Sequence, residues 1–184
     1  MQPPILNLPP TTRWTIAALT VVWLLDVATN HMLTGLFAFR GIHDARSIVT
    51  MGSYGLVHAD LAHLAMNLVG VAVLGKVLEP RIGGRRLLLL LLIGTAAGAA
   101  VHAAIDHGYL IGISAGVGAL YGTALPAARN GRFGAFDRLI VLLAMLFVLV
   151  SLAGLLLPIM PGVAHAAHLG GFLAGLLLSH RLLP

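Results

Sequence analysis

The chain has 184 residues, of which 59% are hydrophobic and only 9% are charged, whereas a soluble domain carries roughly 25% charged residues. This composition excludes an ordinary soluble protein and indicates an integral membrane protein with one compact domain over residues 1–184. Because cysteine is absent, a disulfide framework and a thiolate metal site are excluded as well.

Six apolar stretches have about the 20 residues that a helix needs to cross the hydrocarbon core of a bilayer. Long apolar runs favour helices over barrel strands, which alternate in segments of about ten residues. The stretches cover residues 14–33, 58–78, 86–105, 110–128, 138–157 and 164–183. We therefore predict an all-α membrane protein, a bundle of six transmembrane helices after a short tail over residues 1–13. The first stretch is expected to be a retained anchor, because no small-x-small cleavage site follows it.

The distribution of basic residues predicts the orientation of these helices, because cytoplasmic segments are enriched in Lys and Arg. With the N-terminus inside, the outer segments hold only Arg40 and Arg46, and the inner segments hold nine basic residues. The inner residues are Arg13, Lys76, Arg81, Arg85, Arg86, Arg129, Arg132, Arg138 and Arg181. Both termini are therefore expected in the cytoplasm, and the formal net charge of +5 is interpreted as a topology signal rather than a nucleic-acid surface.

One carboxylate interrupts the first apolar stretch. Asp26 lies about 18 Å along the helix from Arg13, a depth at which a carboxylate needs a partner, water or a proton. We expect Asp26 to form a structural hydrogen bond to a neighbouring helix rather than to take part directly in chemistry.

Polar side chains occur at one common depth in three of the predicted helices. The second, fourth and sixth stretches enter the membrane from the outer side, and their polar residues fall in roughly the outer third of the bilayer. These residues are His58, His63, Asn67, Ser114, His165 and His168. Their shared depth indicates a single site built from three helices.

Spacing along each helix predicts which of these side chains meet. His63 and Asn67 are four residues apart and share a face, whereas His58 points toward the preceding loop. On the sixth helix, His168 lies on the face of the small residues Gly171 and Gly175.

The fourth helix presents a small face of its own, formed by Gly118 and Gly122. Close packing of glycine faces would bring Ser114 within hydrogen-bond distance of His168. A histidine beside a serine can remove its proton and create a nucleophile for acyl transfer. Asn67 and His63 could then donate hydrogen bonds to the developing oxyanion. His165 points off the glycine face, so we expect it to tolerate replacement.

Other interpretations of these residues remain open. A lone serine in a membrane helix often bonds only to its own backbone carbonyls. The histidines could instead bind Zn or Cu in a metal-binding carrier, although Asp60 is the only nearby carboxylate. The sequence GISAG fits the nucleophile elbow of α/β-hydrolases, which needs a strand–turn–helix context. Because it opens a membrane helix here, that fold is excluded, and we expect no metal and no cofactor.

Four segments in order, "HADLAHLAMN", "LEPRIGGRR", "GISAG" and "AHLGGFLAG", resemble the rhomboid intramembrane serine proteases. The resemblance covers residues 54–178, the second to sixth stretches. It implies that Ser114 is the nucleophile and His168 the base, and that His63 and Asn67 are oxyanion donors. It also implies a supporting role for His58 and matches Gly112 to the glycine two residues before the nucleophile.

The resemblance implies a six-helix protease of the bacterial inner membrane that cleaves transmembrane protein substrates near the outer face. The fifth stretch would face lipid, and with residues 158–163 it would form a lateral access route and a mobile cap. Ala115 replaces the usual glycine, and Gly118 replaces an aromatic residue that packs on the histidine in many members. These departures favour the alternative, an inactive rhomboid-like pseudoprotease that binds membrane clients.

Overall fold

The computed structural model of the protein describes residues 7–106, 108–157 and 159–183. These residues form eight α-helices and two short 3-10 helices, and no strand. The helices are α1 (Pro10–Ala28), α2 (Met32–Phe37), α3 (Ala45–Ser53), η2 (Tyr54–Leu56), α4 (Leu61–Ile82), α5 (Gly84–Ile105), α6 (Ser114–Arg129), η3 (Gly134–Phe136), α7 (Asp137–Leu156) and α8 (His165–Leu182). The prediction of an all-α fold is confirmed. Residues 1–6 of the predicted tail and Pro158 of the predicted cap lie outside the described residues.

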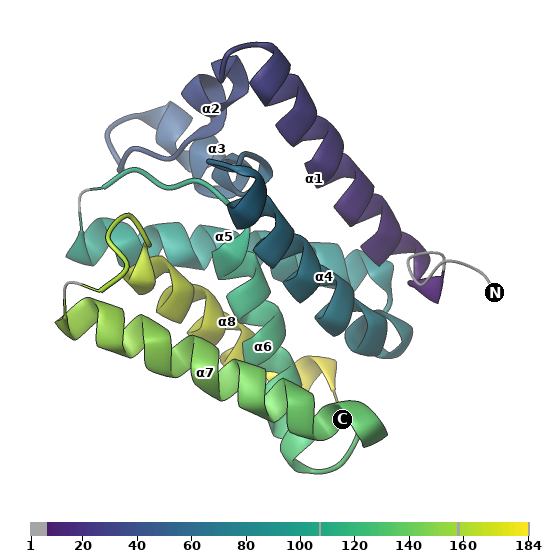
Figure 1. The fold of residues 1–184 in the computed structure, drawn as a ribbon. Coiled ribbons are helices and arrows are strands. Elements are labelled where there is room, and N and C mark those ends of the chain that lie inside the picture. The colour runs from purple at the N-terminus through teal and green to yellow at the C-terminus, as the bar shows by residue number, and fades with distance from the viewer. Residues whose placement is uncertain (1–6, 107, 158, 184) are drawn as a thin grey trace.

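The long helices α1, α4, α5, α6, α7 and α8 pass between two ends of the bundle (Figure 1). The α5–α6 and α7–α8 connections lie together at the left of the view, and the start of α7 and the end of α8 lie at the right. Three segments of the described chain are long and apolar enough to cross a membrane: Leu61–Ile82, Gly84–Ile105 and Gly134–Leu156. The chain therefore has the character of an integral membrane protein, and the six crossings with cytoplasmic termini stay a prediction.

The first helix ends at Ala28 rather than at residue 33, because the backbone reverses direction there. Asn30 and His31 have positive φ angles of 52° and 61°, which break the helical path before α2 begins. Asp26, 0% exposed, accepts hydrogen bonds from the backbone N–H of Thr34 at 2.8 Å and from its hydroxyl at 2.7 Å. The Asp26 carboxylate also lies 3.1 Å from Nδ1 of His31, so it fixes the corner between α1 and α2.

The connection between α1 and α4 is largely helical rather than an irregular loop. Asp44 caps α3 by accepting hydrogen bonds from the backbone N–H and the hydroxyl of Ser47, both at 2.9 Å. The bond from the Ser47 hydroxyl, and after it the bond from the Ser47 N–H, holds the pKa of the Asp44 carboxyl below its usual range. Phe39, between α2 and α3, pairs with Leu110 in an isolated antiparallel bridge. This pairing keeps residues 110–113 out of a helix.

A buried carboxylate joins the end of α4 to the start of α1. Glu79 accepts hydrogen bonds from the backbone N–H of Thr11 at 2.8 Å and from the N–H and hydroxyl of Thr12, both at 2.7 Å. Negative charge is favourable at a helix N-terminus because the first N–H groups lack partners within the helix. Glu79 therefore anchors α1 against α4.

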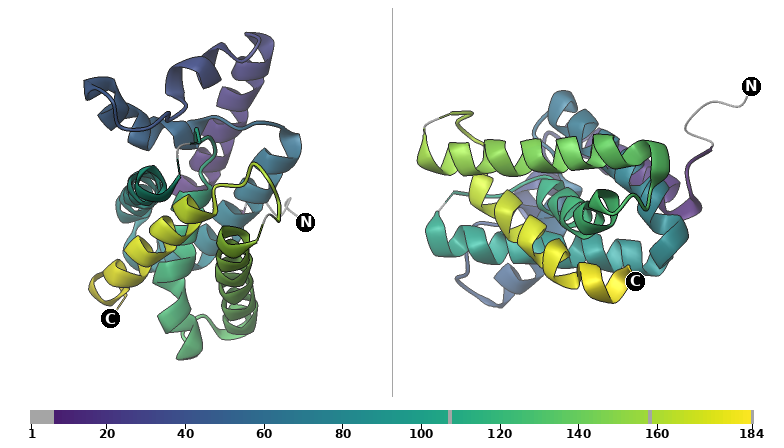
Figure 2. Two further views of the ribbon diagram at one scale, coloured as in Figure 1. Left: turned by 90° about the vertical axis from the view of Figure 1, so that its left-hand side faces the viewer. Right: turned by 90° about the horizontal axis from the view of Figure 1, so that it is seen from below.

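The centre of the bundle is α6, which packs most extensively against α8 and then against α5. The right-hand view of Figure 2 looks nearly along α6 and shows it between α5, α7 and α8. With 16 residues, α6 is about 24 Å long, shorter than a hydrocarbon core of about 30 Å. The predicted fourth helix begins at Ser114 rather than at residue 110. The loop before it lies inside the bundle, with residues 110, 112 and 113 buried.

Candidate active site

Ser114 and His168 meet at the N-terminal ends of two adjacent helices. Ser114 is the first residue of α6, and His168 is the fourth residue of α8. The Ser114 Oγ lies 2.8 Å from Nε2 of His168, within the range for a strong hydrogen bond. The two residues are 54 positions apart in the sequence, so the contact depends on how closely α6 and α8 pack.

Glycines on α8 allow that close packing. A Cβ on Gly171 would overlap the carbonyl of Ala115, and a Cβ on Gly175 would overlap the carbonyl of Ala119. In the other direction, a Cβ on Gly122 of α6 would overlap the carbonyl of Phe172. The α8 glycines therefore face α6 as backbone against backbone, and their nearest neighbours are alanines rather than Gly118 and Gly122.

The loop before Ser114 runs directly beside His63 and Asn67. Gly112 has φ +94°, and a Cβ there would lie 2.5 Å from Nε2 of His63 and 3.6 Å from Nδ2 of Asn67. Any larger residue would therefore both strain the backbone and displace the histidine. The Gly112 N–H donates to the carbonyl of Tyr54 at 3.0 Å, which holds the loop in place.

Both proposed donors lie in the first two turns of α4. Asp60 caps this helix by accepting from the backbone N–H of His63 at 2.8 Å. Asn67 donates one amide hydrogen to the carbonyl of His63 at 3.1 Å, and its NH₂ carries a second hydrogen. The buried ring of His58 lies edge-on to His63, with centroids 5.1 Å apart, so His58 supports that ring.

His165 points away from the glycine face of α8, toward α7 and the connection between α7 and α8. It is only 5% exposed, and its ring lies where a Cβ on Gly154 of α7 would be. Its Nε2 is 3.4 Å from the carbonyl of Ile159, in the connection between α7 and α8. His165 therefore packs between α7 and that connection, and whether it tolerates replacement stays a prediction.

The metal interpretation gains no support from this arrangement. Among the described residues, no three His, Cys, Asp or Glu side chains lie together as a metal site requires. The rings of His165 and His168 are edge-on, with centroids 6.1 Å apart, and His168 uses its Nε2 toward Ser114.

The structure also shows what surrounds Ala115 and Gly118, the two departures from the family pattern. The methyl group of Ala115 packs on Gly98 of α5, where a Cβ would lie 2.5 Å from it. The space over Gly118 is occupied by Phe147 of α7, whose ring lies 5.1 Å from the His168 ring at an interplanar angle of 34°. An aromatic residue thus packs on the histidine, but it comes from another helix.

Sequence reasoning missed two residues of α7 that contact His168. Phe147 stacks on the ring, and the hydroxyl of Ser151 lies 3.5 Å from its Nδ1. One feature of the sequence could have indicated Ser151, because it is the only polar residue in the apolar run over residues 139–157.

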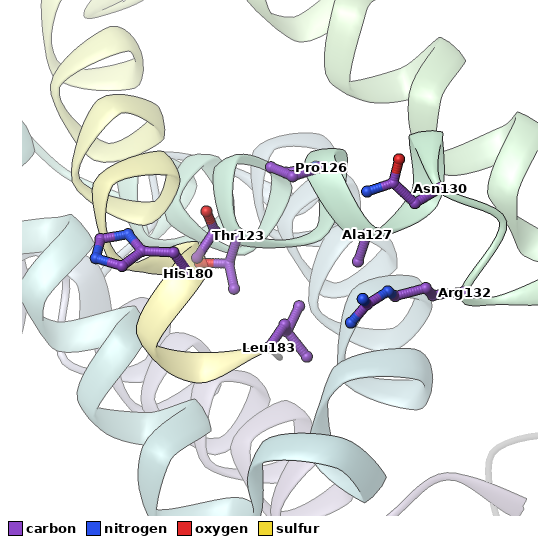
Figure 3. Close-up of a pocket in the computed structure, with 8 residues that line it drawn as sticks. Thr123, Pro126, Ala127, Asn130, Arg132, His180 and Leu183 are labelled. Carbon is purple, nitrogen blue, oxygen red and sulfur yellow. The ribbon is translucent and has the colours of Figure 1, made fainter.

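A separate hollow of about 210 Å³ lies at the opposite end of α6 and α8 (Figure 3). It is lined by Thr123, Pro126, Ala127, Asn130, Arg132, Ser179, His180 and Leu183. Its nearest α6 residue, Thr123, is nine positions beyond Ser114, about 14 Å along the helix. This hollow is therefore distinct from the Ser114–His168 site.

Two comparisons relate the chain to known proteins. The Rhomboid domain family matches residues 45–184. The chain is also similar to RHOMBOID-like protein 6, mitochondrial, from Arabidopsis thaliana, with 30% identity over 128 residues. That alignment covers 69% of this chain and 41% of the relative, so the chain spans less than half the length of that protein.

Proposed function

The chain belongs to the rhomboid family, and we propose that it is an intramembrane serine protease that hydrolyses peptide bonds of transmembrane protein substrates. The observation that carries this proposal is the 2.8 Å contact between the Ser114 hydroxyl and Nε2 of His168. A serine becomes a nucleophile when an adjacent base removes its proton, and this contact supplies the base.

The proposed reaction follows the usual course of acyl transfer. The Ser114 Oγ attacks the scissile carbonyl carbon while its proton passes to Nε2 of His168. When the tetrahedral intermediate collapses, the peptide C–N bond breaks and His168 returns the proton to the leaving amine. Water then attacks the acyl-enzyme ester, and His168 again acts first as base and then as acid.

Donors for the oxyanion come from two elements. Ser114 is the first residue of α6, so its backbone N–H has no partner within the helix. The side chains of His63 and Asn67 approach this loop at Gly112. Preorganised donors of this kind stabilise the charge that develops on the carbonyl oxygen.

Membrane access follows from the helix arrangement. We take the six long helices as transmembrane, with both termini in the cytoplasm, so that the starts of α4, α6 and α8 lie toward the outer face. Most of the apolar segment Gly134–Leu156, which contains α7, is not buried inside the protein. This exposure supports lateral access of a substrate beside α7 and the α7–α8 connection.

We propose that the protein lies in the bacterial inner membrane. A C-terminal reporter that works only outside the cell should therefore be silent, and an active reporter would contradict this orientation.

The alternative is a pseudoprotease that binds membrane clients without hydrolysis. It is favoured by Ala115 and Gly118, the two departures from the family pattern. The Ala115 methyl packs on Gly98, and Phe147 lies over Gly118. Neither departure removes a group from the Ser114–His168 pair, so we retain the protease as the main proposal.

A fluorophosphonate probe tests the proposal in the purified, lipid-reconstituted protein. We expect the probe to label the wild type at Ser114, as located by peptide mapping, and to leave Ser114→Ala and His168→Ala unlabelled. Ser179→Ala is the matched control, because Ser179 is a buried serine at the far end of α8. A folded wild type that neither labels nor cleaves a transmembrane substrate would overturn the protease and leave the pseudoprotease.

A further inference from the structure

Helix α7 brings two side chains against the ring of His168, whose Nε2 faces Ser114. Phe147 and Ser151 are four residues apart and therefore share one face of the helix. Ser151 is only 1% exposed, although most of the helix around it is apolar and faces outward. A buried hydroxyl needs a hydrogen-bond partner. The two polar groups near the Ser151 hydroxyl are the carbonyl of Phe147 and Nδ1 of His168.

The direction of the hydrogen bonds can be worked out atom by atom. The Ser151 hydroxyl has one proton, which it donates to the carbonyl of Phe147 at 2.7 Å. Toward Nδ1 of His168, 3.5 Å away, the Ser151 oxygen can therefore only accept. This requires a proton on Nδ1, and a neutral imidazole protonated at Nδ1 has its lone pair on Nε2.

That tautomer is the one that the Ser114 hydroxyl needs as an acceptor. With the lone pair on Nε2, the Ser114 hydroxyl donates to it across the observed 2.8 Å. The distance to Ser151 is long for an N–H···O bond. Such contacts shorten when charge develops during the reaction, because a charged donor makes a stronger bond.

The ring of Phe147 restricts the other degree of freedom. Its centroid lies 5.1 Å from that of His168, with 34° between the planes, and 5.4 Å from the ring centroid of Tyr121 in α6. Stacking limits tilting of the imidazole, and the Ser151 contact limits its rotation.

We propose that Ser151 is a positioning residue that keeps the proton of His168 on Nδ1, and that Phe147 holds the plane of the same ring. This assignment deepens the proposed protease function and rests on it. It places a neutral hydroxyl where triad proteases have a carboxylate. It also makes the base dependent on α7, so the dyad is correctly arranged only while α7 packs against α8.

The first arm of the test isolates the Ser151 hydroxyl from its packing. Thr and Val have nearly the same shape, so Ser151→Thr and Ser151→Val impose the same steric change and differ by one hydroxyl. We expect Ser151→Val and Ser151→Ala to lower kcat for a transmembrane substrate about tenfold or more with KM changed less than twofold. Ser151→Thr should keep most of the wild-type kcat. Equal kcat values for the Thr and Val variants would overturn the assignment.

A control tests whether the loss of any hydroxyl that bonds to its own helix backbone has the same effect, and half-buried Thr20 provides it. Thr20 of α1 donates to the carbonyl of Ile16, four residues earlier, at 2.9 Å, as Ser151 does to Phe147. Thr20→Val should leave kcat unchanged. Thermal unfolding of every variant in the same detergent shows whether a loss of kcat reflects a loss of folded protein.

The second arm does not require hydrolysis. In protein labelled with ¹⁵N-histidine, the ring shifts of His168, assigned with His168→Ala, report which nitrogen carries the proton. We expect Nδ1–H in the wild type and in Ser151→Thr, and a substantial Nε2–H population in Ser151→Val. The same tautomer in all three would refute the positioning role. A wild type with the Nδ1–H form but no labelling or cleavage would instead overturn the protease proposal.

Discussion

Gly171 of α8 lies so close to α6 that a Cβ placed on it would overlap the carbonyl of Ala115, the residue that follows Ser114. The closeness of this approach sets how near His168, one turn earlier on α8, comes to the serine. For transmembrane helices, which we propose α6 and α8 to be, small residues let the backbones approach and gain van der Waals contact, because lipid supplies no hydrophobic driving force for their association.

Replacing Gly171 with Ala should therefore damage both stability and the site. The added methyl group must push α8 away from α6, and overpacking of this kind typically costs about 1–3 kcal/mol. We expect a lower melting temperature in detergent and a large loss of cleavage. Gly35→Ala is the control, because a Cβ on Gly35 of α2 meets nothing within 4 Å. Equal behaviour of the two variants would show that the α6–α8 contact is looser than described.

The four polar residues of the site should divide into two groups. Ser114→Ala and His168→Ala remove the nucleophile and the base, so we expect no detectable cleavage. Asn67→Ala and His63→Ala each remove one oxyanion donor, which costs about 10²–10³ in turnover in a well-studied hydrolase. Because the remaining donors partly compensate, these variants should be slow but measurable. A folded Asn67→Ala protein as inactive as Ser114→Ala would mean that Asn67 does more than donate.

Asp26 is expected to matter for stability rather than for turnover. Its carboxylate accepts from the N–H and hydroxyl of Thr34 and contacts His31, so Asp26→Asn replaces an acceptor with a donor where donors converge. Hydrogen bonds to charged groups contribute about 1.5–3 kcal/mol. We expect a clear fall in melting temperature with turnover per folded molecule within about twofold. Asp44→Asn is the comparison, since Asn caps a helix about as well as Asp. A stable but inactive Asp26→Asn protein would place Asp26 in the chemistry instead.

Sequence reasoning identified the Ser114–His168 pair because its signals are local. Helical spacing places a histidine above Gly171 and Gly175, and glycine faces predict close contact. The start of α6 was misplaced because Leu110 is held by Phe39, a contact between segments far apart in the chain. Phe147 was missed because nearly every residue of α7 is apolar, so no pattern indicates which face turns toward His168.

His165 gives the clearest test of side-chain packing near the site. Its ring occupies the space where a Cβ on Gly154 would lie, and its Nε2 is 3.4 Å from the carbonyl of Ile159. His165→Ala leaves a hole between α7 and the α7–α8 connection, so we expect reduced stability and partial activity. This differs from His168→Ala, which should be inactive.

Gly154→Ala is the reciprocal change. Alone, its methyl group collides with the His165 ring and should lower the melting temperature. In the His165→Ala background the collision is removed and the methyl group partly fills the hole, so Gly154→Ala should cost much less there or even stabilise. Residues in contact commonly show coupling of about 0.5–3 kcal/mol in such double-mutant cycles. Thermal unfolding of the four proteins measures this coupling directly. Additive effects would mean that His165 and Gly154 are not in contact in the folded protein. An inactive His165→Ala protein with normal stability, alongside an active His168→Ala protein, would contradict the proposal that His168 is the base and would give that role to His165.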